Sequence, residues 1–282
     1  MNDQQVLPDD GLITPEIGSW GEHKYLLVSN YARIFASSMK TKWHCRVYID
    51  LFAGAGRSRI ARTSRIVPAS PLLALDIPDR FDRYIFCEKD EVKMSALKQR
   101  VQTNYPDIDV HYVLGDSNLL GSEMLLKIPK AQKDFTVLAF CFADPCNMKS
   151  LRFATVQQLS ERFMDFLILI PSGMDANRNL KPHYLNPSNQ TIDRFIGTSK
   201  WREEWQKIEL SQSFDIFLTN MYGQNMQELG YDYPGIEITQ LIRSADKNLP
   251  LYRLAFFSRH GLGEKLWKET KRYCDPQLKL FD

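Results

Sequence analysis

Apolar and polar positions alternate in blocks along this chain, and the blocks predict helices and strands in turn. Tyr25, Val28, Ala32 and Phe35 recur at helical spacing, which predicts an amphipathic helix over residues 20–40. Short apolar runs typical of buried strands then return at residues 46–52, 83–88, 109–116, 135–145 and 165–172. Helices are expected between them, at residues 70–76, 91–105 and 150–163. Such alternation predicts an open, mostly parallel sheet covered by helices on both faces.

The last third of the chain departs from this alternation. Residues 173–235 are polar and carry aromatic side chains, which predicts a helical insertion. Two strand-like runs, residues 235–244 and 251–260, are joined by a short polar turn and are expected to pair as an antiparallel hairpin. The predicted fold class is therefore α/β, a Rossmann-like sheet of seven mostly parallel strands with a C-terminal antiparallel hairpin. We expect one domain over residues 1–282, with residues 1–45 as an N-terminal helical extension.

Composition narrows the class of protein. The chain has 282 residues, 44% of them hydrophobic and 25% charged, which suits one elaborated domain with a full core. A formal net charge of +2 does not by itself indicate nucleic-acid binding, so a surface of that kind would be a local patch. Five cysteines without a C-x-x-C pair predict neither a disulfide framework nor a bound metal. The N-terminus lacks a signal-peptide pattern and no stretch could span a bilayer, which predicts a soluble, cytoplasmic protein without membrane contact.

A glycine loop, YIDLFAGAGRSRI at residues 48–60, follows the first predicted strand. Gly54 and Gly56 permit a tight turn and a close approach of the backbone to a ligand, and a helix after the loop would offer free N–H groups. Position 59 is arginine, so the third glycine of the dinucleotide-binding pattern is absent, and Asp50 stands where a pyrophosphate would be repelled. The loop, with Ala53 in it, favours a ligand with an ammonium group and no phosphate. S-adenosylmethionine is such a ligand.

Acidic residues end the following strands in an order that suits the rest of S-adenosylmethionine. Glu88 ends the second strand, where a carboxylate accepts hydrogen bonds from the ribose hydroxyls. Asp116, followed by Ser117, ends the third strand near the expected adenine, and Asp144 ends the fourth near the transferable methyl group. Each acid alone could equally be a solvated strand end or a helix cap. With the glycine loop after Asp50, these three acids make four strand-end features. Four such features in the correct order rarely arise by chance, so together they predict a methyltransferase-like protein.

Several stretches together resemble the three-Cys-motif partner protein family, a bacterial and phage group with a class I methyltransferase-like fold. They cover nearly the whole chain and read WGEHKYLLVSNY, YIDLFAGAGRS, SPLLAL, FCEKD, FADP and YRLAFFSRHGLGEKLWKE. The resemblance implies a three-cysteine-motif protein as partner. It also implies an S-adenosylmethionine site formed by Asp50, Gly54, Gly56, Glu88 and Asp116.

The residues after the fourth strand leave several interpretations open. Asp144 and the carbonyl of Pro145 could orient an exocyclic amine, which favours amino-group methylation of a nucleic acid. Cys146 could instead attack a cytosine, although the next strand lacks the glutamate that supports such a ring. Family members carry an aromatic residue and a glycine where this chain has Cys146 and Asn147, which favours a non-catalytic scaffold for a partner protein. Asp144 could also simply be the N-cap of the following helix.

Arginines supply the candidates for acceptor binding. Four follow the glycine loop, where they could contact phosphates or form an ordinary solvated surface. Arg259 and His260, near the last strand, are expected on the same face, with His260 as a packed or capping side chain. The predicted acceptor-binding residues are Arg57, Arg59 and Arg259, with Arg62 and Arg65 beside the first two.

Two further groups of side chains carry weaker expectations. Lys24, on the first helix, could reach the carboxylate of the cofactor, or could be a solvated lysine. In the insertion, the aromatic side chains could form a recognition surface or dock a partner. They are Tyr184, Phe195, Trp201 and Trp205, and the spacing of the two tryptophans is more typical of a core.

Overall fold

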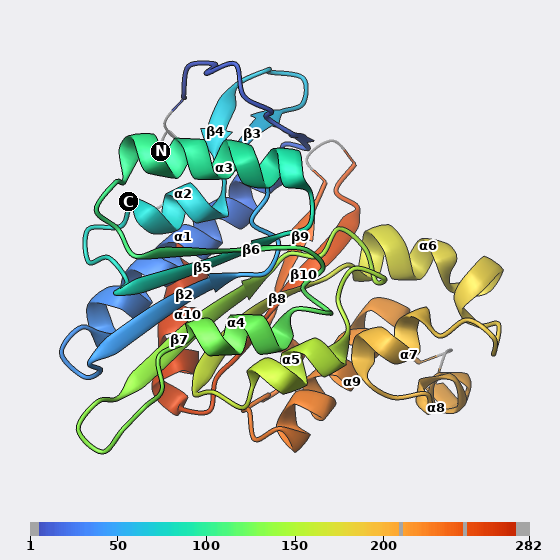
Figure 1. The fold of residues 1–282 in the computed structure, drawn as a ribbon. Coiled ribbons are helices and arrows are strands. Elements are labelled where there is room, and N and C mark those ends of the chain that lie inside the picture. The colour runs from blue at the N-terminus through green and yellow to red at the C-terminus, as the bar shows by residue number, and fades with distance from the viewer. Residues whose placement is uncertain (1–5, 209–210, 245–246, 275–282) are drawn as a thin grey trace.

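A seven-stranded sheet forms the centre of the protein in a computed structural model that describes residues 6–208, 211–244 and 247–274 (Figure 1). The strand order is β6-β5-β2-β7-β8-β10-β9; β10 runs antiparallel to both its neighbours and the other pairs are parallel. This is the predicted Rossmann-like class I methyltransferase fold with a C-terminal antiparallel hairpin. The strands are β2 (Cys45–Asp50), β5 (Arg83–Glu88), β6 (Val110–Leu114), β7 (Val137–Ala143), β8 (Met164–Ile170), β9 (Gln240–Arg243) and β10 (Pro250–Phe257).

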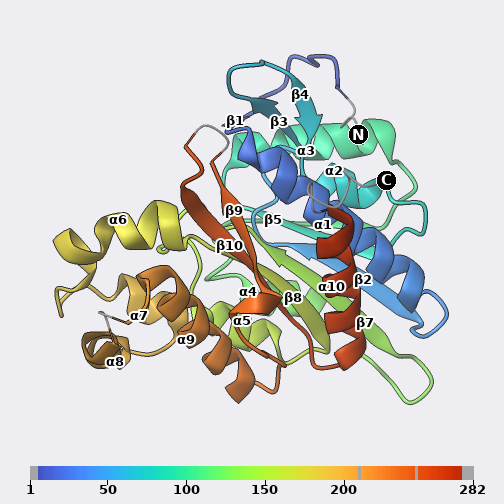
Figure 2. The same cartoon turned by 180° about the vertical axis from the view of Figure 1, so that it is seen from behind.

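Helices cover both faces of the sheet, as right-handed crossovers between parallel strands require. One face carries α1 (Trp20–Met39), α2 (Ser70–Leu75), α3 (Glu91–Asn104) and α10 (Gly261–Cys274) (Figure 2). The other face carries α4 (Gly121–Lys127), α5 (Phe153–Leu159) and α9 (Phe214–Glu228). Within the described part of the chain, no helix is both long enough and apolar enough to cross a membrane.

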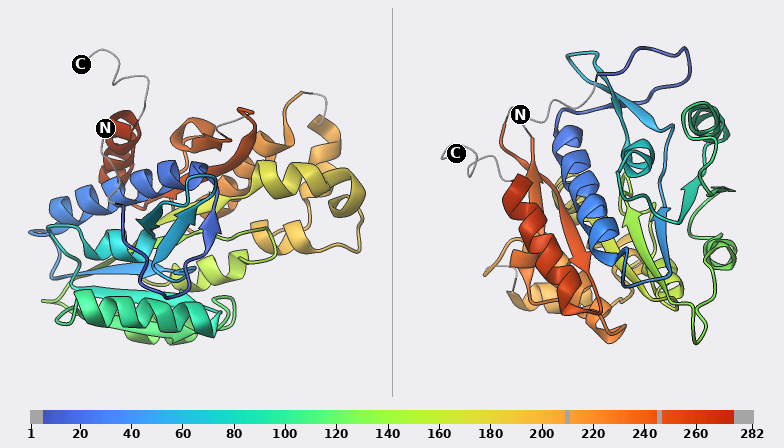
Figure 3. Two further views of the ribbon diagram at one scale, coloured as in Figure 1. Left: turned by 90° about the horizontal axis from the view of Figure 1, so that it is seen from above. Right: turned by 90° about the vertical axis from the view of Figure 1, so that its left-hand side faces the viewer.

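The insertion begins where β8 ends and extends to one side of the main sheet (Figure 3). Its short elements are η1 (Ser172–Ala176), α6 (Asn177–Asn179), η2 (Leu180–Tyr184), α7 (Thr191–Ile196) and α8 (Trp201–Ile208), followed by α9. The core interpretation of the two tryptophans is confirmed, and none of the four rings is exposed for recognition or docking, because Tyr184, Phe195, Trp201 and Trp205 are all buried. The two tryptophans pack against Phe214 of α9 and so hold the insertion together.

The hairpin is shorter than predicted at its start. Gly235 has a φ of +135°, and residues Ile236–Ile238 form a 3-10 turn (η3), so β9 begins only at Gln240. Two residues of the predicted turn, 245 and 246, lie outside the described residues.

A second, three-stranded sheet, which the sequence did not predict, has two of its strands between the glycine loop and α2. It joins β1 (Glu16–Ile17), β3 (Arg57–Ile60) and β4 (Ile66–Pro68) in the order β1-β3-β4. The helix predicted at residues 70–76 is confirmed as α2 (Ser70–Leu75), but it does not follow the loop directly. The chain first makes the β3–β4 hairpin, and α2 starts after β4.

Arg100 of α3 anchors the N-terminal segment to the glycine loop. Its guanidinium is buried and donates to the carbonyl of Ala55 at 2.6 Å and to the carbonyl of Ile13 at 3.1 Å. It also forms a two-pronged ion pair with the carboxylate of Asp10, at 2.8 Å for each bond. This hydrogen bonding by Arg100 holds the pKa of Asp10 at about 2.

Replacing Arg100 by Met should lower the free energy of unfolding by about 3 kcal/mol, because Asp10 and the carbonyls would lose a buried partner. Lys40→Met is the control, since Lys40 forms an exposed pair with Asp79 and should cost less than about 1 kcal/mol. Urea denaturation measures both. A carboxyl with a lowered pKa stabilises the fold at higher pH, so the Asp10 contribution should vanish as the pH falls from about 4 to 2. Equal losses in the two variants would contradict the anchor.

Candidate functional site

Two glycines turn the backbone of the glycine loop. Gly54 has a φ of +63° and Gly56 a φ of +81°, conformations that glycine adopts without strain. A Cβ on Gly56 would lie 2.8 Å from Leu97 of α3, so the loop packs closely on that helix. A Cβ on Gly54 would have no described atom within 4 Å. Gly54 therefore faces open space in which a ligand fits.

Glu88, the last residue of β5, braces this loop. Its Oε2 accepts a hydrogen bond from the backbone N–H of Gly54 at 2.9 Å, and its Oε1 accepts one from the N–H of Asp90 at 2.9 Å. The side chain is buried and therefore held in one orientation. A carboxylate oxygen can accept more than one hydrogen bond, so both oxygens remain able to bind a ligand hydroxyl.

Asp50 ends β2 and is fully buried behind the loop. Burial raises the pKa of its carboxyl to about 7, and the Ser70 hydroxyl and the Phe52 N–H oppose this only in part. Its Oδ1 accepts a hydrogen bond from the Phe52 N–H at 3.0 Å, whereas Oδ2 has no donor in bonding geometry among the described residues. The loop thus covers a carboxyl that titrates near neutral pH.

Ser117 is presented by the turn that follows β6. Asp116 is exposed and closes this turn, its Oδ1 accepting a hydrogen bond from the N–H of Asn118 at 2.8 Å. The Ser117 hydroxyl is buried but has no hydrogen-bond partner within the described ranges. Buried hydroxyls are nearly always paired, so this one is a candidate for contact with a ligand.

Asp144 directly follows β7 and forms a largely buried ion pair with Lys24 of α1. Burial alone would lower the pKa of Lys24, but the carboxylate of Asp144 raises it above its usual value. The Nζ atom also lies 5.1 Å from the ring centroid of Tyr25. The interpretation of Lys24 as a solvated lysine was therefore wrong, whereas its contact with a cofactor carboxylate stays a prediction. Asp144 is also not a helix N-cap, because α5 begins at Phe153.

The post-β7 loop, residues 145–152, is held from both sides by side chains that the sequence did not single out. Asn118 accepts a hydrogen bond from the N–H of Arg152 at 2.7 Å. Asp175 of η1 accepts one from the N–H of Met148 at 2.7 Å. Their one signal in the sequence is a polar residue shortly after a strand, which is too common to be diagnostic.

Cys146 lies exposed at the start of this loop. Its Sγ is 3.3 Å from the hydroxyl of Ser150 and 3.4 Å from the side-chain nitrogen of Asn147. Both neighbours are neutral, so neither supplies the charge that activates a cysteine nucleophile.

One cavity of about 470 Å³, a size typical of small-molecule sites, joins these groups at the carboxyl edge of the sheet. The predicted residues that line it are Ala53, Gly54, Arg57, Glu88, Asp116, Ser117, Asp144 and Cys146. Asp50, Gly56 and Pro145 are buried next to lining residues. We call this space the loop cavity.

The arginines after the glycine loop already have partners in the chain. Arg57 pairs with Asp10 at 3.1 Å, and Arg59 pairs with Asp9 at 2.8 Å. Arg65 pairs with Glu22 at 2.6 Å. Contact of Arg57 and Arg59 with an acceptor stays a prediction, but each already pairs with an acid of the N-terminal segment.

Arg259 lies near the amino end of the parallel strand β8, whereas the loop cavity lies at the carboxyl ends of the parallel strands. Its expected placement beside the other arginines was therefore wrong. β10 runs antiparallel to β8, and its end therefore lies beside the start of β8. Arg259 stacks 4.4 Å from the ring of Tyr231 and donates to the carbonyl of Leu229 at 3.0 Å. His260 accepts a hydrogen bond from the N–H of Leu262 at 3.2 Å, as a capping histidine does.

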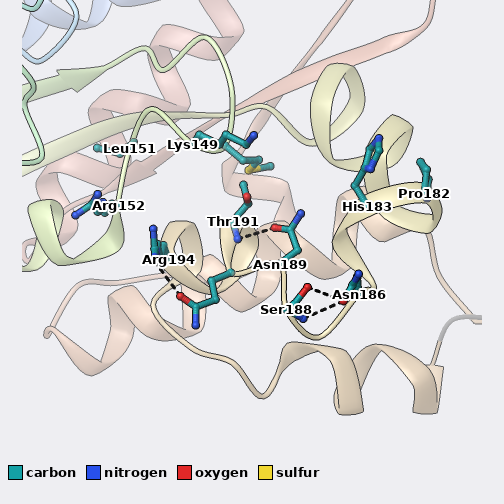
Figure 4. Close-up of a pocket in the computed structure, with 12 residues that line it drawn as sticks. Lys149, Leu151, Arg152, Pro182, His183, Asn186, Ser188, Asn189, Thr191 and Arg194 are labelled. Carbon is teal, nitrogen blue, oxygen red and sulfur yellow. Dashed lines mark hydrogen bonds between the residues drawn. The ribbon is translucent and has the colours of Figure 1, made fainter.

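A second cavity of about 560 Å³ lies between the post-β7 loop and the insertion (Figure 4). We call it the insertion cavity. Its lining includes four basic or imidazole side chains, Lys149, Arg152, His183 and Arg194. Lys149 also lines the loop cavity, so the two cavities meet at this residue.

Comparisons with known proteins agree with this description only in general terms. No protein-family model and no curated protein matches the sequence, so membership in the three-Cys-motif partner family stays a prediction. Protein LPL1258 from Legionella pneumophila str. Philadelphia 1 (family-model DUF519) is similar with 10% identity and a TM-score of 0.48, over 92% of this chain and 94% of that chain.

Two ligand-bound structures are also similar. The N-terminal domain of EvdMO1 with SAH bound has 12% identity and a TM-score of 0.34, over 50% of this chain and 48% of that chain. Cofactor-bound Rv0187 from MTB has 14% identity and a TM-score of 0.39, over 82% and 79%. All these TM-scores are below 0.5, so the fold assignment rests on the strand order and helix placement of the chain itself.

The buried carboxyl of Asp50 should make the protein less stable as the pH rises from about 4 to 7. A carboxyl with a raised pKa binds its proton more tightly in the folded state, so the stability that it contributes is lost over that range. Asp50→Asn should remove about 2 to 3 kcal/mol of the decline between pH 5 and pH 8, measured by urea denaturation at those two pH values. Asp165→Asn is the matched variant, because burial also raises the pKa of Asp165 on β8 to about 7. An unchanged pH dependence in Asp50→Asn would contradict a neutral Asp50.

Proposed function

We propose that this chain binds S-adenosylmethionine in the loop cavity and transfers its methyl group to an amino group of a nucleic acid. The observation that carries the proposal is a single cavity lined by Gly54, Glu88, Ser117 and Asp144. It lies beyond the carboxyl ends of parallel strands, where open α/β sheets bind their ligands. The resemblance to the three-Cys-motif partner family supports the same cofactor.

The residues present fit this cofactor in three places. Glu88 offers carboxylate oxygens to the ribose hydroxyls from a fixed position. Ser117 offers a buried, unpaired hydroxyl to the adenine ring. Gly54 leaves open space for the methionine end, since a side chain there would project into the cavity. The third glycine of the dinucleotide-binding pattern is replaced by Arg59, which argues against a dinucleotide.

S-adenosylmethionine, when bound, supplies a methyl group attached to a positively charged sulfur. The remaining task of the chain is to hold an acceptor nitrogen in line with that methyl group. Asp144 lies at the cavity wall, and Lys24 fixes the direction of its carboxylate. This carboxylate and the carbonyl of Pro145 would accept hydrogen bonds from an amino group, which turns the nitrogen lone pair toward the methyl group. The acceptor nitrogen would bond to the methyl carbon as the methyl–sulfur bond breaks and its electron pair stays on sulfur, and the nitrogen would then release a proton to solvent.

A non-catalytic scaffold is the second candidate, and one observation favours it. The polar groups after Asp144 bond within their own loop, with Ser150 contacting both Cys146 and Asn147. Together with the Lys24 pair, these contacts leave the rim of the cavity largely satisfied by the chain itself. In this case the loop cavity would stabilise a surface for a three-cysteine-motif partner protein.

Cytosine-5 methylation by Cys146 is the third candidate. Cys146 lines the loop cavity, but its neighbours Ser150 and Asn147 do not activate it. The chain after β8 continues as Pro171, Ser172 and Gly173, where this chemistry would need a glutamate. These features favour the amino-group reaction.

Glu88→Gln should weaken the binding of S-adenosylhomocysteine by about tenfold to a hundredfold, because one of the two acceptor oxygens is lost. Isothermal titration calorimetry measures the affinity. Glu123→Gln, on α4 and paired with Lys127 at 3.4 Å, is the matched control and should bind like the unmodified protein. Equal affinity in the two variants would show that Glu88 does not hold the ligand.

Asp144→Asn should lower the rate of methyl transfer by about a hundredfold or more while S-adenosylhomocysteine still binds. Because this change leaves Lys24 buried without its partner, Lys24→Met/Asp144→Asn serves as a second variant that keeps the fold. Lys24→Met alone separates loss of the cation from loss of the carboxylate. The readout is labelled methyl incorporated into DNA and RNA. Full activity in the double variant would contradict a role for Asp144, and an inactive unmodified protein that binds the cofactor would favour the scaffold.

A further inference from the structure

The insertion cavity is lined by positive charge that the chain does not neutralise. Among the described residues, the cations of this lining, Lys149, Arg152 and Arg194, have no ion-pair partner. The described lining contains no aspartate or glutamate. The nearest acid along the chain, Asp193, is instead paired with Arg202 at 2.6 Å. A cavity of this kind attracts an anion.

Two of these cations stand on a rigid support. Lys149 and Arg152 belong to the post-β7 loop, whose backbone is held by Asp175 at Met148 and by Asn118 at Arg152. The loop is therefore fixed on both sides of Lys149, and an anion bound there would not have to order it. Such preorganisation lowers the entropic cost of binding.

The insertion contributes neutral donors to the same cavity (Figure 4). The side-chain oxygen of Asn186 accepts the N–H of Ser188 at 3.0 Å, and that of Asn189 accepts the N–H of Thr191 at 2.9 Å. The Asn186 oxygen also accepts the hydroxyl of Ser188 at 2.9 Å, and each of the two side chains keeps an amide NH₂ group that can donate to a ligand. Donors beside cations suit phosphate oxygens, which only accept hydrogen bonds.

We propose that the insertion cavity binds a phosphate group of the methyl acceptor, with Arg152 and Arg194 as its main contacts. This inference rests on the proposed function, since it assigns the acceptor of that reaction. Arg57 and Arg59, the arginines first expected to contact phosphate, already have carboxylate partners, whereas Arg152 and Arg194 have none among the described residues. Lys149 lines both cavities, so a phosphate in one would lie next to an acceptor group in the other.

The test compares two double variants with the same loss of charge. Arg152→Gln/Arg194→Gln removes the proposed contacts, and Arg178→Gln/Lys200→Gln removes two exposed charges of the insertion outside the lining. The probes are a nucleoside 5′-monophosphate, the same nucleoside without phosphate, and a single-stranded oligonucleotide of about 12 nucleotides. Binding is measured by calorimetry or fluorescence anisotropy at several salt concentrations.

The first double variant should bind the phosphate-bearing probes at least tenfold more weakly, with a salt slope reduced by about one to two. The control variant should stay within about twofold of the unmodified protein, and the nucleoside should bind equally to all three. Binding of the monophosphate would indicate a nucleotide-sized acceptor, and binding of the oligonucleotide alone would indicate a nucleic-acid backbone. Equal losses in both double variants, or no binding of either phosphate probe, would overturn the proposal.

A parallel titration with S-adenosylhomocysteine separates this inference from the proposed function. If the cofactor product binds and neither phosphate probe does, the phosphate site fails while the cofactor site stands. If the phosphate probes bind through Arg152 and Arg194 and S-adenosylhomocysteine does not, the proposed function fails and the anion site stands.

Discussion

The ion pair between Lys24 and Asp144 is the contact on which the carboxyl edge of the sheet depends. An ammonium group buried without a counter-ion would cost several kcal/mol, so α1 can pack across the sheet in this position only because an acid follows β7. The helix in turn places Tyr25, whose hydroxyl lies 3.0 Å from that of Ser58 in β3. The same pair directs the carboxylate of Asp144 at the cavity wall. One interaction thus joins the helix, the small sheet and the proposed catalytic acid.

The main sheet could be predicted because each parallel strand is an uninterrupted apolar run. β7 and β8 are buried along their whole length, so the apolar run itself carries the signal. The small sheet carried no such signal. β3 reads as Arg-Ser-Arg-Ile, and it becomes a strand because Ser58 and Ile60 are buried while the two arginines pair with acids of the N-terminal segment. The π-helical turns η1 and η2 likewise have no distinctive period in the sequence.

Some residues of the candidate site could be predicted from the local sequence, whereas others depend on contacts with residues distant in sequence. Gly54, Glu88, Ser117 and Asp144 were predictable because a strand end places its next residue at the ligand edge without help from the rest of the chain. Whether an arginine has an ion-pair partner depends on acids distant in sequence, so a cluster of arginines in the sequence did not reveal the ones without such a partner. The direction of a single strand decided the placement of Arg259. Asn118 follows β6 and Asp175 follows β8, but both bond to the loop after β7. No local sequence pattern predicts such contacts.

The insertion extends the ligand edge beyond what the sheet alone provides. Its aromatic residues pack into its own core. Its polar side chains, among them Asn186, Asn189 and Arg194, line the insertion cavity. The role proposed for the insertion cavity depends on binding of S-adenosylmethionine in the loop cavity.

The most direct test of that binding is a crystal structure of the protein with S-adenosylhomocysteine. We expect the ribose at Glu88, the adenine at Ser117 and the amino-acid end at Gly54; a ligand bound elsewhere, or a loop cavity that stays empty at saturating ligand, would contradict this account.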